Sequence, residues 1–92
     1  MAKNEKLKLI EGTFLHDEAR EVLKSIYSAK INFHQRKNFS SQERFGKDDI
    51  IAKKRIPALM KEMVKLEKIL TAAKTKDKKL IISSEINISL SD

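Results

Sequence analysis

Residues 49–76 read DIIAKKRIPALMKEMVKLEKILTAAKTK, and this stretch decides the fold. Its apolar residues recur at alternating spacings of four and three, at Ala52, Ile56, Leu59, Met63, Leu66, Leu70 and Ala73. This heptad spacing places side chains along one side of a helix and lets them pack against a second helix. The stretch therefore predicts a helix over about 49–76 with a single apolar seam.

The start of this helix and its proline allow two interpretations. Asp48 or Asp49 can cap the helix, because a short acidic side chain accepts hydrogen bonds from the free N–H groups of the first turn. Pro57 lies inside the seam, where it leaves the carbonyl of Lys53 without a donor. Regular helix could instead begin at Pro57, since proline suits a first turn. The acidic pair upstream favours the longer helix with a bend at Pro57.

A second helical pattern precedes the first in the chain. Apolar residues at helical spacing predict a helix over about 17–38, at Ala19, Val22, Leu23, Ile26 and Phe33. Residues 39–48 are interpreted as a tight apex between the helices, because Ser40 and Glu43 match a capping box and Gly46 suits a left-handed backbone position. A short connection between two long helices makes them antiparallel neighbours.

Both ends of the chain alternate apolar and polar residues with a period of two. Over about 6–14, Leu7 and Leu9 alternate with lysines, and Gly12 is expected to end or bulge the strand. Over about 80–90, one face collects Ile82, Ser84, Ile86, Ile88 and Leu90. The sequence therefore predicts a single α+β domain over 1–92, of strand-helix-helix-strand order: a long antiparallel helical hairpin with a small antiparallel sheet formed by the terminal strands.

A two-stranded sheet is only marginally stable in water, and its free edges invite further pairing. We therefore expect a homodimer, joined through the sheet, the helix seam or both, with a further protein partner possible. The candidate interface residues are Leu59, Met63, Leu66, Leu70, Ile82, Ile86 and Ile88.

The amino-acid composition excludes several kinds of functional site. The 92 residues include no cysteine and only two histidines, which excludes disulfides and thiolate sites and leaves too few ligands for most histidine-based zinc sites. The two glycines, Gly12 and Gly46, form no phosphate-binding motif. His34 has no acidic orienting group one turn away and no clear nucleophile nearby, so a structural role is favoured over a catalytic one. We expect a non-enzymatic protein without cofactors.

The chain is basic, with a formal net charge of +7 and a pI near 9.7. This charge attracts phosphates irrespective of base sequence, so nucleic-acid binding is the alternative function. Its candidate residues form two clusters at opposite ends of the hairpin, Arg36, Lys37 and Arg44 near the apex and Lys74, Lys76, Lys78 and Lys79 at the base. Phe33 is expected to be buried, which leaves few aromatic rings for base stacking. The apolar seam is too narrow to favour a membrane partner.

The segments SAKINFH at residues 28–34 and NFSSQERFGK at residues 38–47 resemble a group of small bacterial proteins of the Bacteroidota to which no function is assigned. This resemblance covers less than a quarter of the chain. It implies a bacterial, cytoplasmic origin and transfers no functional residues.

Overall fold

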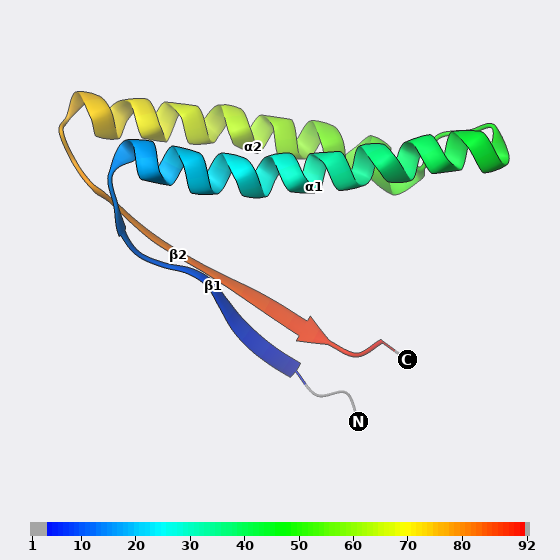
Figure 1. Ribbon diagram of the computed structural model, residues 1–92, viewed down its shortest axis with the longest axis horizontal. Helices are drawn as coiled ribbons and strands as arrows, with labels where there is room; N and C mark the ends of the chain where they lie inside the picture. Colours follow the sequence, from blue (N-terminus) through cyan, green and yellow to red (C-terminus); the bar gives the residue numbers. More distant parts are fainter. Residues whose placement is uncertain (1–3, 92) are drawn as a thin grey trace.

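The computed structural model describes residues 4–91 and has the predicted order of elements (Figure 1). It consists of β1 (Asn4–Phe14), α1 (His16–Phe45), α2 (Ile50–Thr75) and β2 (Leu80–Ser89). The two helices lie side by side as a hairpin, and β1 pairs with β2 antiparallel in a two-stranded sheet. The α+β class and the helical hairpin are thus confirmed.

The apex of the hairpin is shorter than predicted. α1 continues to Phe45 instead of ending near 38, so the proposed capping box at Ser40 and Glu43 is wrong. The helix ends at Gly46, whose φ of 66° and ψ of 22° give the predicted left-handed position. Glycine adopts this conformation without the steric cost of a Cβ.

Polar residues in the last turns of α1 hold the connection to α2. The Ser41 hydroxyl donates to the Lys47 carbonyl at 2.9 Å, and the Gln42 amide donates to Asp48 Oδ1 at 2.7 Å. The N–H of Asp49 donates to Asn38 Oδ1 at 2.8 Å. These bonds fix the angle at which the chain enters α2.

Asp49 is the cap of α2, because its carboxylate accepts from the N–H of Ala52 at 2.9 Å. Pro57 lies inside this helix, which excludes the alternative that regular helix begins there. Asp48 has a different role and pairs with Lys53 at 3.1 Å. Hydrogen bonds from Lys53, and then from Gln42 and Asn38, hold the pKa of Asp48 below its ordinary value.

The apolar seam of α2 is covered within the same chain. All of its residues are buried or half-buried, and Leu66 and Leu70 form the core cluster with Ala19 of α1. Side chains from α1 and from the near ends of both strands pack around this cluster, namely Phe14, Leu23, Tyr27, Leu80 and Ile82. The seam therefore joins the two halves of the hairpin.

The face that α1 turns towards α2 differs from the prediction in its second half. Ile31 is buried there, and His34 and Asn38 are half-buried. Phe33 is 49% exposed, so its predicted burial is wrong. Two positions along a helix differ by about 200° around its axis, and burial of Ile31 therefore turns Phe33 outward.

The sheet contains a bulge that the alternation of Leu7 and Leu9 did not predict. Leu7 faces Ile86 across the sheet, but Ile10 rather than Leu9 faces Ser84, and the register shifts between Lys8 and Ile10. The extra residue puts Leu7 and Ile10 on one face of the strand. The strand continues through Gly12, so the expectation that Gly12 ends or bulges it is wrong.

Candidate functional site

The hairpin and the sheet diverge from a common base and leave a wedge-shaped opening between them. In Figure 1 the strands leave the base of the hairpin together and run away from both helices. The strand residues that pack against the core cluster all lie near that base, as Phe14 and Leu80 do. Farther out, a crevice of about 540 Å³ separates the inner face of the sheet from the helices, lined by Ile10, Leu23, Ile26, Tyr27, Leu59 and Ile86 among others.

The molecule is accordingly thin and extended. Its principal extents are 50 × 36 × 15 Å and its radius of gyration is 16.7 Å. A compact domain of this length has a radius of gyration of about 12 Å. A single copy is therefore much less compact than a typical domain of this length.

The predicted interface residues divide into two groups. Leu59, Leu66 and Leu70 are buried and Met63 is half-buried beneath α1, so the helix seam is already occupied within one chain. Ile82 is half-buried against the core cluster. Ile86 and Ile88 remain exposed on the inner face of the sheet, at 38% and 47%. The helix seam is therefore not free to contact a second copy, whereas Ile86 and Ile88 of the sheet are exposed.

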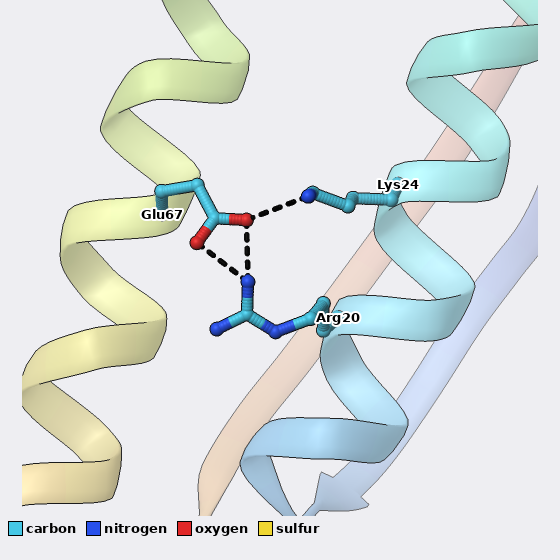
Figure 2. Close-up of polar contacts among 3 residues, drawn as sticks. All are labelled: Arg20, Lys24 and Glu67. Carbon is cyan, nitrogen blue, oxygen red and sulfur yellow. Dashed lines mark hydrogen bonds and ion pairs between the residues drawn. The ribbon is translucent and has the colours of Figure 1, made fainter.

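A charged cluster joins the helices close to the base (Figure 2). Glu67 of α2 accepts hydrogen bonds from Arg20 of α1, and its Oε1 lies 3.0 Å from Lys24 Nζ. The hydrogen bond from Lys24, followed by that from Arg20, lowers the pKa of Glu67. Arg20 and Lys24 are one helical turn apart, so a single carboxylate reaches both. This contact links the two helices near the base.

Replacing Glu67 by Gln should lower stability by a small amount at neutral pH, because the side chains of all three residues are substantially exposed. A carboxylate whose folded pKa lies below its ordinary value of 4.5 stabilises the fold above that value. The contribution is lost as pH falls through the lowered folded pKa. Melting temperatures of both proteins from pH 7 to pH 3 should therefore converge in acid, and a constant difference would contradict this role.

The two predicted basic clusters lie in different surroundings. Arg36, Lys37 and Arg44 share a shallow groove of about 590 Å³ near the apex with Phe33, Ser40 and Phe45. We call this the apex groove. Lys74, Lys76, Lys78 and Lys79 lie at the opposite end of the hairpin, around the end of α2, and we call them the base lysines. The structure therefore brings three of the seven candidate residues together in one groove. Phe33 and Phe45 line the same groove, and the sequence did not predict either of them there.

The histidines form no recognisable reactive site. His34 lies between the helices with its ring 5.3 Å from that of Phe33, and its buried Nδ1 has no hydrogen-bond partner in the described residues. His16 Nδ1 lies 2.9 Å from Asp17 at the start of α1. Over residues 4–91, no three His, Cys, Asp or Glu side chains are grouped to hold a metal ion. Neither described helix is long and apolar enough to cross a membrane.

Comparisons with protein-family models, curated proteins and solved structures gave no significant match.

Proposed function

We propose that this protein is a small, non-enzymatic assembly module whose working form is a homodimer. The observation that supports the proposal is its surface area of 7692 Å². A folded monomer of 10.6 kDa exposes about 5,500 Å². The excess of roughly 2,200 Å² is in the range that each subunit of an obligate homodimer buries.

The inner face of the sheet is the part of this surface that a second copy would cover. Leu7, Ile86 and Ile88 present partly exposed apolar side chains there. Both strands are also edge strands with unpaired backbone groups. Contact with another sheet or helix pair would bury these residues, adding support to a ribbon that is marginal alone.

Ile88→Lys should weaken the dimer by about tenfold or more, because it places a charge where an apolar side chain would be buried. Its cross-strand neighbour is Glu5, so the added lysine faces a carboxylate and the single chain should fold. Light scattering measures the mass, and wild type should give twice 10.6 kDa at micromolar concentration.

Ile81→Lys is the matched control. Ile81 is on the same strand but points to the outer face, where it is 88% exposed. The Ile81→Lys variant should therefore remain a dimer. A monomeric wild type, or equal dissociation of both variants, would contradict the proposed interface.

The same proposal includes a cytoplasmic location, which the resemblance to Bacteroidota proteins implies. A further protein partner would bind the assembled dimer. The nucleic-acid alternative depends on other residues and has its own test.

A further inference from the structure

The apex groove combines unpaired positive charge with exposed aromatic rings. Arg36, Lys37 and Arg44 lie on its walls, and none of their side chains forms an ion pair with another residue in the range 4–91. The one acidic lining residue, Asp49, is engaged in capping α2. Its lining carries three cations against this one carboxylate, so the groove has a net positive charge, which attracts polyanions.

The part of α1 that leads into the groove is poor in acidic residues. Residues 22–42 contain Lys24, Lys30, Arg36 and Lys37 and no Asp or Glu. Residues 61–68 of α2 instead intersperse charges of both signs, as with Lys65 and Glu62, which lie 3.5 Å apart. Positive charge therefore dominates the second half of α1 in a way that a mixed, merely solubilising surface does not.

Two aromatic rings line the same groove. Phe33 is 49% and Phe45 is 69% exposed, and Lys37 Nζ lies 5.8 Å from the centre of the Phe33 ring. Arg36 and Arg44 are eight positions apart, which separates them by about 12 Å along the helix. Cations spaced over several nucleotides beside exposed rings are what single-stranded nucleic acids require, because phosphates bind the cations and unpaired bases stack on the rings.

We propose that the apex groove binds single-stranded nucleic acid, with Arg36, Lys37 and Arg44 on the phosphates and Phe33 and Phe45 against the bases. This site is distinct from the inner face of the sheet. Its test therefore does not depend on whether the protein is a dimer. Duplex would bind more weakly, because its stacked bases are closed to the phenylalanines.

Two variants with the same net charge distinguish binding at the apex groove from a general attraction of nucleic acid to the basic protein. The apex variant carries Arg36→Gln, Lys37→Gln and Arg44→Gln, and the base variant carries Lys74→Gln, Lys78→Gln and Lys79→Gln. Each loses three positive charges and changes the formal net charge from +7 to +4. All six residues are exposed, so both variants should keep the fold, which circular dichroism would check.

Fluorescence anisotropy with a labelled 15-nucleotide single strand and the matching duplex would measure binding at about 50 and 200 mM salt. We expect the apex variant to bind the single strand at least tenfold more weakly than wild type, and the base variant to stay within about twofold. The slope of log affinity against log salt should fall by about 2 in the apex variant, since each single-strand phosphate contact contributes about 0.7.

Phe45→Ala tests the stacking step without changing charge. It should weaken single-strand binding at least about fivefold and leave the salt slope unchanged. Equal losses in the apex and base variants would show attraction by net charge alone and overturn the site. Absence of wild-type binding at low salt, or preference for the duplex, would overturn it as well.

Discussion

Replacing Leu66 by Asp should unfold the protein or lower its melting temperature by about 16 °C or more. Leu66 belongs to the core cluster with Ala19 and Leu70, and it is buried within a single chain. The substitution removes a buried leucine and places a carboxylate among apolar side chains, at a combined cost of about 4 kcal/mol or more. A chain of this length has a total stability of only about 5–14 kcal/mol. Thermal melting followed by circular dichroism would measure the effect.

Ile69→Asp is the control for Leu66→Asp. It introduces the same group on the same helix, but Ile69 is largely exposed. It should cost less than about 1 kcal/mol. The sequence alone could not decide whether Leu66→Asp would unfold the chain or only separate two copies. Because the structure covers Leu66 with α1, a folded monomeric Leu66→Asp variant would show that this packing is wrong.

The heptad seam shows what a periodic pattern can and cannot predict. Its seven residues were identified correctly as one packed side of α2, because burial follows directly from helical spacing. The pattern does not say which helix covers that side. The sequence therefore predicts contacts with a second copy for four of these residues, although all four are already buried or half-buried within a single chain.

The apex was misjudged for a chemical reason. Asn38 and Ser41 are of residue types that favour turns and caps, and the sequence therefore predicts that the helix ends near 38 and that 39–48 form the apex. In the structure Asn38, Ser41 and Gln42 remain helical, and their side chains bond the following loop across six to eleven positions. A local pattern cannot distinguish a polar side chain that caps its own helix from one that bonds the next segment.

The composition of the candidate nucleic-acid site depended on tertiary packing. Arg36, Lys37 and Arg44 were identified from charge, but Phe33 was expected in the core. Burial of Ile31 turned Phe33 into the apex groove. The contact of Glu67 with Arg20 and Lys24 was equally hidden, because it joins residues 47 and 43 positions apart and needs the register of the hairpin.

Pro57→Ala is expected to stabilise the protein by about 1–3 kcal/mol and raise its melting temperature by about 5–20 °C. Pro57 lies in the eighth position of α2, where it removes a helical hydrogen bond to the carbonyl of Lys53. Alanine restores that donor and has the highest helix propensity. The side chain at this position is exposed, so the substitution takes away no core contact.

Lys54→Ala, at another exposed position in the same part of α2, measures the gain from helix propensity alone and should change stability by less than about 0.5 kcal/mol. If Pro57→Ala stabilises the protein clearly more than Lys54→Ala does, then Pro57 destabilises α2 in the native protein. If Pro57→Ala instead lowers the melting temperature, the proline is needed for packing. Ala52 and Leu59 lie in the seam on either side of it, and both must reach α1. Loss of Pro57 would then change how these two residues pack on α1, and the apex groove, which begins beside Asp49, would change shape with it.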